Sequence, residues 1–274
     1  MPKLPAPPIP KALKPKPKRP GQNGNGNGNG NGKLSPAEVA QEAGVTVVDW
    51  IDERTSLSGG IRWMLFRKVP RGVNWFYTLG SATMFAFLSQ AATGVFLAMF
   101  YRPDATGGAY ESMRSIVDDA FLGQFVRGMH KWGASVMVIL IFLHMGRVFF
   151  FGAYKYPREM TWIIGVVLLI LTLAMSFTGY LLPFDDRAYW ATIVGVNING
   201  TAPFLGPYLS DFLRAGPEFG ANTLSRFYAI HMLLLPGLII ALIGAHLYLV
   251  SKLGISAPPW LKSHEEPELD VAEV

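Results

Sequence analysis

The sequence contains no cysteine. This absence excludes disulfide bonds, thiolate metal sites, cysteine-ligated iron-sulfur clusters and any group attached through a thioether. Charged residues are also scarce, at 16% of the 274 residues, whereas apolar residues make up 50%. This balance is unusual for a soluble chain, and the mean hydropathy of +0.28 indicates a membrane protein. Any redox metal must therefore be held by ligands other than thiolates.

The apolar residues are gathered in four windows that contain no Asp, Glu, Lys or Arg, at 75–101, 132–146, 160–184 and 227–251. The second window is short, but it continues past Arg147 through four more apolar residues. About 20 helical residues, each rising 1.5 Å, cross the core of a bilayer. We therefore expect an all-α membrane protein, a bundle of four transmembrane helices.

The first 73 residues have a different composition. Residues 1–33 combine a Pro/Lys stretch with repeated Asn-Gly pairs and have no apolar face, which is typical of a disordered basic tail. Ser35, Pro36 and Glu38 have the spacing of a helix start. The alternation of apolar and basic residues at 61–68 favours an interfacial segment, with a loosely ordered linker as the alternative. The predicted organisation is a disordered basic tail at 1–33, cytoplasmic or interfacial helices at 34–73, the transmembrane domain at 74–252 and a cytoplasmic tail at 253–274.

Loop charges predict the orientation. The loop between the second and third windows carries Lys155 and Arg158, whereas the other two loops hold more acidic than basic residues. The positive-inside rule then places both termini and this basic loop in the cytoplasm. The second and fourth helices consequently run in the same direction, from outside to inside. The positive charge is a topology signal, and we expect no nucleic-acid partner.

Four of the five histidines fall on those two parallel helices. His130 and His144 are 14 residues apart and His231 and His246 are 15 apart, about four turns in each case, so each pair shares a helix face. His130 should lie level with His231 near the outer surface, and His144 level with His246 near the inner one. Two imidazole pairs at two depths are what two stacked bis-histidine haems require. A single intramembrane histidine can instead serve only as a hydrogen-bonding partner between helices.

The other two helices carry a matching spacing of glycines. Gly80 and Gly94 are 14 residues apart in the first helix, as are Gly165 and Gly179 in the third. A macrocycle wedged between helices needs close backbone approach to its face, which a residue without a side chain permits. We expect Gly94 and Gly179 at the outer level and Gly80 and Gly165 at the inner level.

Two arginines flank the histidines of the second helix. Arg127 lies three residues before His130, and Arg147 lies three residues after His144. Both should sit near the membrane edges, where they can neutralise haem propionates. The alternative for each is ordinary snorkelling of the side chain to the interface.

Five motifs surround these positions: NWFYTLG at 74–80, RGMHKW at 127–132, PREMTW at 157–162, TGYLLPFD at 178–185 and LSRFYAIH at 224–231. Together they resemble cytochrome b, the haem subunit of quinol:cytochrome c oxidoreductases. The resemblance covers about residues 70–258. The four-helix length and the 15-residue separation in the last helix resemble the short, split form, cytochrome b6. The resemblance implies a low-potential outer haem on His130 and His231 and a high-potential inner haem on His144 and His246.

Two positions depart from the cytochrome b6 pattern. Thr78 stands where that family has the cysteine that attaches an extra haem c, and Ser251 replaces a family arginine near that haem. We therefore expect two non-covalent haem b groups and no covalent haem c on this chain.

The resemblance implies a path of electrons from an outer quinol-oxidising site to an inner quinone site, with a contribution to proton translocation. Tyr180, Pro183, Phe184 and Asp185 lie in a segment that resembles one wall of the quinol pocket; no residue is assigned a catalytic role. The chain lacks the family's Pro-Glu-Trp-Tyr motif. The implied partners are a separate subunit-IV-like membrane subunit with the quinol-site glutamate, a Rieske iron-sulfur protein, a c-type cytochrome, quinol or quinone, and a second copy of the complex in a homodimer. The chain should not be active alone, and the basic tail favours a bacterial plasma membrane.

Two other functions are compatible with intramembrane histidines. One is a dihaem membrane anchor of a hydrogenase, formate dehydrogenase or nitrate reductase, which would lack the paired glycines and the outer quinol segment. The other is a non-redox channel or transporter, whose ionisable groups would line a polar pathway rather than form two level pairs.

Overall fold

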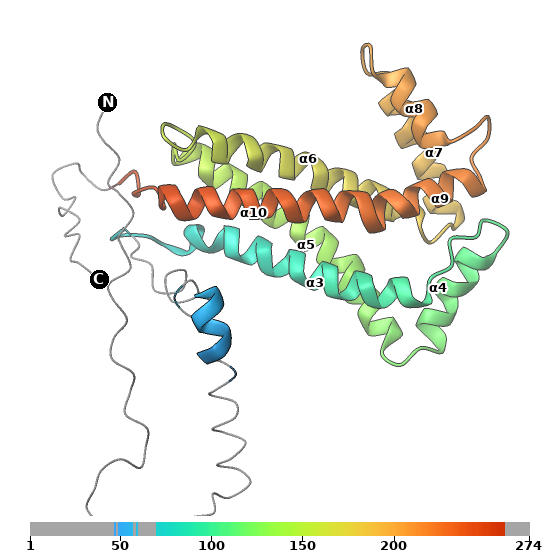
Figure 1. The fold of residues 1–274 in the computed structure, drawn as a ribbon. Coiled ribbons are helices and arrows are strands. Elements are labelled where there is room, and N and C mark those ends of the chain that lie inside the picture. Colours follow the sequence, from blue (N-terminus) through green and yellow to red (C-terminus); the bar gives the residue numbers. More distant parts are fainter. Residues whose placement is uncertain (1–46, 48, 57–58, 60–69, 261–274) are drawn as a thin grey trace, which may run out of the picture. The chain divides into compact units, whose positions relative to one another are not determined.

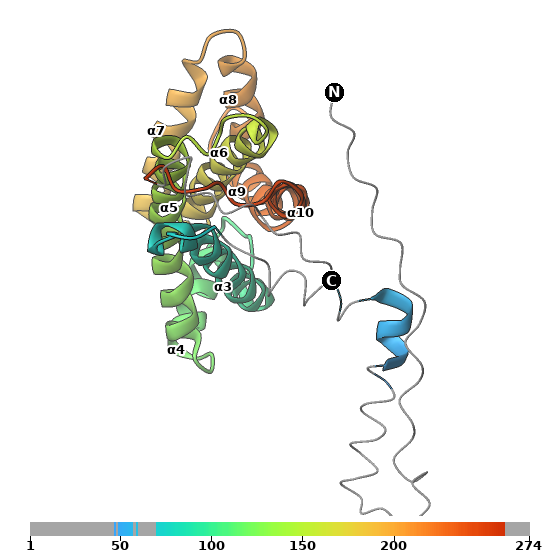
Figure 2. The ribbon, with the colours of Figure 1, turned by 90° about the vertical axis from the view of Figure 1, so that its left-hand side faces the viewer.

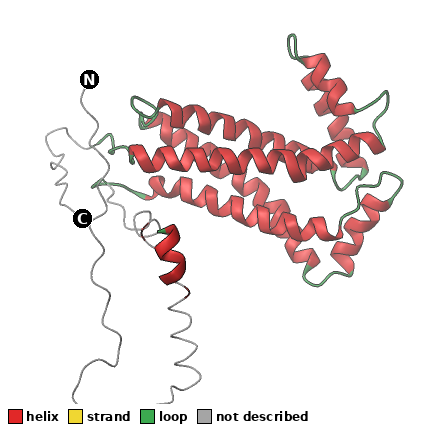
Figure 3. Cartoon of the chain, in the orientation of Figure 1, coloured by secondary structure: helices red, strands yellow, loops and turns green. Residues whose placement is uncertain are grey.

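The computed structural model describes residues 47, 49–56, 59 and 70–260. These residues belong to two units, Met1–Leu65 and Phe66–Val274. Every regular element among them is helical (Figure 3). The predicted tail at 1–33, the helix start at Ser35, the segment at 61–68 and residues 261–274 of the C-terminal tail lie outside the described residues.

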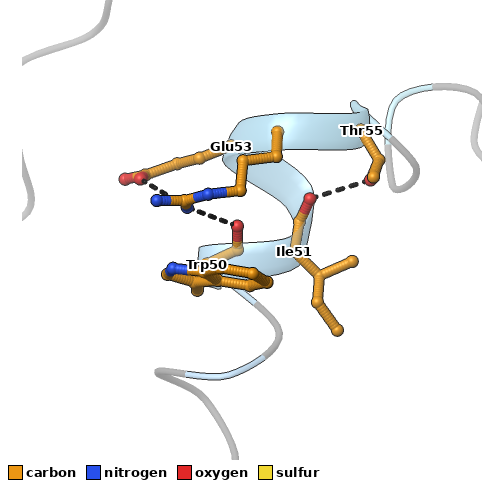
Figure 4. Close-up of polar contacts among 5 residues, drawn as sticks. Trp50, Ile51, Glu53 and Thr55 are labelled. Carbon is orange, nitrogen blue, oxygen red and sulfur yellow. Dashed lines mark hydrogen bonds and ion pairs between the residues drawn. The ribbon is translucent and has the colours of Figure 1, made fainter.

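The described part of the first unit is a short helix at 49–55 (Figure 4). The Arg54 guanidinium lies 4.0 Å from the centre of the Trp50 ring and donates a 2.8 Å hydrogen bond to the Trp50 carbonyl. The Thr55 hydroxyl donates to the Ile51 carbonyl at 2.8 Å. These contacts tie one turn together locally, and an interfacial position for this helix stays a prediction.

Four long helical segments of the second unit can cross a membrane by length and composition: Trp75–Phe100, Gly123–Phe150, Glu159–Leu181 and Ala221–Leu253. They comprise η1 (Trp75–Thr78) with α3 (Leu79–Phe100), α5 (Gly123–Phe150), α6 (Glu159–Leu181), and α9 (Ala221–Ala229) with η2 (Ile230–Leu234) and α10 (Leu235–Leu253). Large apolar side chains point outward from all of them; Phe85 is 76% exposed and Leu233 78% exposed. Such a surface is stable against lipid rather than water. The predicted four-helix membrane bundle is confirmed.

The second of these helices begins earlier than its charge-free window. It starts at Gly123, whereas the window opens at residue 132. Arg127 and Lys131 interrupt the apolar run, but both have long side chains that can extend toward the interface from a continuous helix. A rule based on absent charge therefore locates the helix but misses its first two turns.

The connections fall at two opposite ends of the bundle (Figure 1). The short turn between α5 and α6 lies at the same end as the start of α3 and the end of α10. The opposite end carries α4 (Gly108–Asp118), α7 (Asp186–Gly200) and α8 (Gly206–Arg214). The helices α5 and α10 therefore run in the same direction, as the odd number of crossings between them requires.

The long helices pack as two pairs, α3 against α5 and α6 against α10, and the view along the bundle shows all four around one axis (Figure 2). The pairs approach each other mainly through α5 and α6. At the end that carries α4, α7 and α8, a tight apolar core fastens these elements to the bundle. Its buried members are Tyr101, Ala109, Ile116, Leu181, Val196, Leu213, Leu224 and Phe227. The Tyr101 hydroxyl donates to the Leu182 carbonyl at 2.7 Å, and burial raises the pKa of Tyr101, so this donor keeps its proton.

Candidate functional site

The outer histidines face each other across the two helix pairs. His130 comes from α5 and His231 from the π-helical turn η2, and their ring centroids are 6.4 Å apart with the ring planes at 77°. His231 is buried, with 7% of its surface exposed. π-Turns within α-helices occur frequently at functional sites. The structure thus brings together the two residues that the sequence predicts at one level.

Hydrogen bonds define which nitrogen of each outer ring is free. The Nδ1 atom of His231 lies 3.0 Å from the Met175 carbonyl oxygen, which can only accept, so Nδ1 carries the hydrogen. The Nδ1 atom of His130 lies 2.9 Å from the Thr93 hydroxyl, which already donates to the Ser89 carbonyl at 2.7 Å. His130 is therefore also the donor at Nδ1. Both rings retain an Nε2 lone pair, the form of imidazole that binds a metal.

The distance between the two rings fits a metal between them. A bond from a metal to an imidazole nitrogen is about 2 Å long, so two rings on opposite sides of one metal have centroids roughly 6 Å apart. The observed separation is 6.4 Å. The described residues contain no group of three or more His, Cys, Asp or Glu side chains that could hold a bare ion. Two axial imidazoles without further protein ligands fit an iron whose other ligands belong to a macrocycle.

Each outer glycine lies directly against an imidazole. A Cβ atom on Gly94 would lie 3.3 Å from Cε1 of His130, and one on Gly179 would lie 2.6 Å from Cε1 of His231. The outer level is thus an ordered row of glycine, ring, ring and glycine. The sequence analysis expects these glycines to clear a macrocycle, whereas the atoms that a side chain would meet first belong to the histidine rings.

The inner level repeats this arrangement on the same helices. A Cβ atom on Gly80 would lie 3.2 Å from Cε1 of His144, and one on Gly165 would lie 3.5 Å from Cε1 of His246 and 3.8 Å from Sδ of Met145. Because Met145 follows His144 in the chain, α5, α6 and α10 meet at this level. The Nδ1 atoms of His144 and His246 are buried without a hydrogen-bond partner in the protein. Buried polar atoms of this kind require an explanation, and a bound group is one.

The two predicted arginines lie in different surroundings. The Arg147 guanidinium stacks 3.9 Å from the centre of the Tyr77 ring, and its Nε atom is buried without a partner. Arg127 lines a surface depression together with Arg114, Asp118, Pro183 and Asp185. Both arginines are three residues from a predicted ligand, and their contact with propionates stays a prediction.

The predicted quinol-pocket residues surround the junction between α6 and α7. Tyr180 is 49% exposed, and the Phe184 ring packs edge-on against Tyr189 with centroids 6.0 Å apart. Asp185 caps α7 by accepting a 2.8 Å hydrogen bond from the Ala188 N–H. This cap gives Asp185 a structural role that the sequence analysis misses.

Pro183 and Asp185 share the depression that contains Arg127. Phe184 and Asp185 line a second depression, together with Tyr110 and Asp186. The part of the predicted wall that faces these depressions is therefore Pro183, Phe184 and Asp185.

Sequence reasoning misses three polar side chains next to the outer histidines: Thr93, Thr178 and Gln90. A signal for the threonines is present in the sequence. The outer glycines Gly94 and Gly179 both follow a threonine, whereas the inner glycines follow Leu79 and Ile164.

A model of the family described as cytochrome b/b6/petB matches residues 65–254. The chain belongs to the cytochrome b/b6 family. Members of this family are haem b proteins of membrane electron transport, which agrees with the facing imidazoles and the four candidate membrane spans. This member is accordingly a multi-pass membrane protein.

Curated relatives match the chain over almost their whole length. The menaquinol:cytochrome c reductase cytochrome b subunit of Geobacillus thermodenitrificans is 43% identical over 218 residues, which is 77% of this chain and 97% of the relative. The cytochrome b6 of Heliobacterium modesticaldum is 39% identical over 213 residues, which is 77% of this chain and 100% of the relative.

A solved structure described as a hyperthermophilic respiratory Complex III contains a similar chain. Its TM-score is 0.73 and its sequence identity 30%, over 81% of this chain and 59% of that chain. This cytochrome b/b6 family member thus spans somewhat more than half of the Complex III chain.

Proposed function

We propose that this chain is the dihaem cytochrome b subunit of a quinol:cytochrome c reductase. It carries electrons across the membrane from an outer quinol-oxidising site to an inner quinone site and contributes to proton translocation. The observation that carries the proposal is the outer row of Gly94, His130, His231 and Gly179, with 6.4 Å between the ring centroids. The relatives named for menaquinol:cytochrome c reductases support it, and they favour menaquinol as the quinol.

Two non-covalent haem b groups complete the site. His130 and His231 supply the axial nitrogens of the outer haem, and His144 and His246 supply those of the inner haem. Haem, when bound, supplies reversible one-electron chemistry within the membrane. Gly80, Gly94, Gly165 and Gly179 let the helix backbones approach the four imidazoles, while Arg127 and Arg147 balance the propionate charges.

The helix spacing sets two levels for electron transfer. Histidines 14 residues apart on α5 are separated by about 21 Å along the helix axis. This offset covers most of a hydrocarbon core about 30 Å thick. One imidazole pair therefore serves each half of the membrane, and the protein provides both with a water-free setting.

The chain works within a larger assembly. A separate membrane subunit supplies the quinol-site glutamate, because the Pro-Glu-Trp-Tyr motif does not occur in this sequence. A Rieske iron-sulfur protein and a c-type cytochrome accept electrons on the outer side, and the complex forms a homodimer in a bacterial plasma membrane. Both termini face the cytoplasm, as the basic loop between α5 and α6 indicates. Pro183, Phe184 and Asp185 form part of the quinol pocket wall.

The haem content of the purified complex tests this function. We expect two b-type haems for each copy of this chain, with absorbance in the reduced-minus-oxidised spectrum and a Rieske protein in the same preparation. A complex with a hydrogenase or dehydrogenase subunit would instead indicate a membrane anchor. A preparation of correctly inserted protein without haem would contradict the proposal.

A further inference from the structure

The hydroxyl groups of Thr93 and Thr178 are fixed as acceptors toward the outer histidines. Thr93 lies 2.7 Å from the Ser89 carbonyl oxygen, and Thr178 lies 3.0 Å from the Ala174 carbonyl oxygen. Each hydroxyl hydrogen is therefore directed back to its own helix, as is common for threonine in membrane helices. The remaining lone pairs face His130 at 2.9 Å and His231 at 3.1 Å. Both threonine side chains are buried, so water does not compete for these contacts.

The backbone of His130 is held by the same turn of α3. The Gln90 amide, in the orientation that its surroundings require, donates to the His130 carbonyl at 2.8 Å and accepts from the Ala134 N–H at 3.3 Å. Gly133 makes room for this amide, because a Cβ atom there would collide with the Gln90 side chain. Gln90 and Thr93 thus hold the backbone and the ring of one residue.

The inner histidines have no counterpart to these contacts. The Nδ1 atoms of His144 and His246 are buried without a protein partner. The threonines nearest in kind, Thr83 and Thr172, donate to Leu79 and Leu168 of their own helices. Neither hydroxyl has a histidine partner among the described residues. The two levels therefore have the same ligands and glycines but different support.

This difference has an electronic consequence. An imidazole that donates a hydrogen bond from Nδ1 becomes a more basic ligand through Nε2. A more basic ligand favours the oxidised, more positively charged iron over the reduced one. Resting on the two haems of the proposed function, we propose that Thr93 and Thr178 are positioning residues that orient the outer imidazoles and lower the reduction potential of the outer haem relative to the inner one.

The two threonines differ in how replaceable they are. The Nδ1 atom of His130 has Thr93 as its hydrogen-bond partner, whereas that of His231 also has the Met175 carbonyl at 3.0 Å. Removing the Thr93 hydroxyl leaves His130 with an unsatisfied donor, while removing the Thr178 hydroxyl leaves His231 with an acceptor. The larger effect should follow from the change at Thr93.

Redox titration of the haem absorbance bands in the purified complex tests the proposal. Thr93→Val should raise the midpoint potential of the outer haem by on the order of tenfold in the ferrous-to-ferric ratio, about 59 mV for a one-electron couple. Thr178→Val should raise it less, and the inner haem should not change in either variant. Thr93→Ser keeps the hydroxyl and should restore the original potential. The matched controls are Thr83→Val and Thr172→Val, which remove hydroxyls that contact only their own helices.

The oxidised haems provide a second measurement, because the g-anisotropy in electron paramagnetic resonance depends on the angle between the ligand planes. The outer signal should move in Thr93→Val, and the inner signal should stay. Loss of the outer haem alone in Thr93→Val, with retention in Thr93→Ser, would also support a holding role.

An outer potential that does not move in Thr93→Val, or that moves equally in the controls, would overturn the proposal. Absence of haem from the unmodified complex would instead contradict the proposed function, so the two failures are distinguishable.

Discussion

Substitution of Gly179 by alanine tests the row of glycines and imidazoles at one atom. The new Cβ atom would lie 2.6 Å from Cε1 of His231 and 3.2 Å from each of its ring nitrogens. Cβ contacts shorter than 3.0 Å essentially never occur, so the ring or the helix must move. His231 has little freedom, because Met175 and Thr178 hold its Nδ1 atom and His130 lies on its other side.

The size of the effect follows from the cost of overpacking. Forcing an extra methyl group into a packed site costs about 1–3 kcal/mol. If the strain falls on the haem-bound arrangement, the affinity for the outer haem decreases by roughly 5- to 150-fold. Gly165→Ala is the matched control on the same helix, since its Cβ atom would make an ordinary 3.5 Å contact with His246. Alanine also has a better helix propensity than glycine, by about 1 kcal/mol, so this control should be neutral or slightly stabilising.

The assay is haem content and thermal stability of the purified complex, with the two haems resolved by redox titration. We expect Gly179→Ala to lose or shift the outer haem and Gly165→Ala to retain both. Two haems with unchanged spectra and melting temperature in Gly179→Ala would refute the steric reasoning. Equal damage in both variants would show that any side chain on α6 is harmful, whatever its distance from a ring.

Three further outcomes are expected. His130→Ala and His144→Ala should each remove one haem, and different ones, in the reduced-minus-oxidised spectrum; loss of both from either change in normally inserted protein would contradict independent levels. Because Thr78 replaces a cysteine, denaturing gels stained for haem peroxidase activity should show no signal at the mass of this chain, and a band there would disprove the non-covalent assignment. Asp185→Ala should lower the stability of the α7 region by about 0.5–2 kcal/mol in thermal unfolding, whereas Asp185→Asn, which keeps a capping oxygen, should not.

Composition and helical periodicity predict the frame of this structure. The four charge-free windows identify the four helices because a bilayer excludes charge, and the spacing of His130 from His144 follows from the pitch of a helix. The start of α5 is missed because Arg127 and Lys131 end the window while the helix continues. Such errors arise where side chains are long enough to separate their charge from their backbone.

The polar contacts of the outer level could not be predicted in the same way. A threonine that bonds its own helix is common in membrane proteins, so Thr93 and Thr178 have no distinguishing pattern until the rotation of each helix about its axis is known. Gln90 is even less visible, because its partners are backbone atoms of another helix. The role of Asp185 as a cap likewise depends on where α7 begins.

The π-helical turn at Ile230–Leu234 also explains how helices of unequal spacing can hold level pairs. One extra residue in an α-helix would rotate everything beyond it by about 100° and turn a distant side chain away from its partner. A π-turn absorbs that residue locally, because it closes its hydrogen bond over five residues instead of four. The 15 residues from His231 to His246 can thus match the 14 from His130 to His144 in both height and facing. A membrane helix can therefore gain a residue between two ligands during evolution, provided that a single turn widens to contain it.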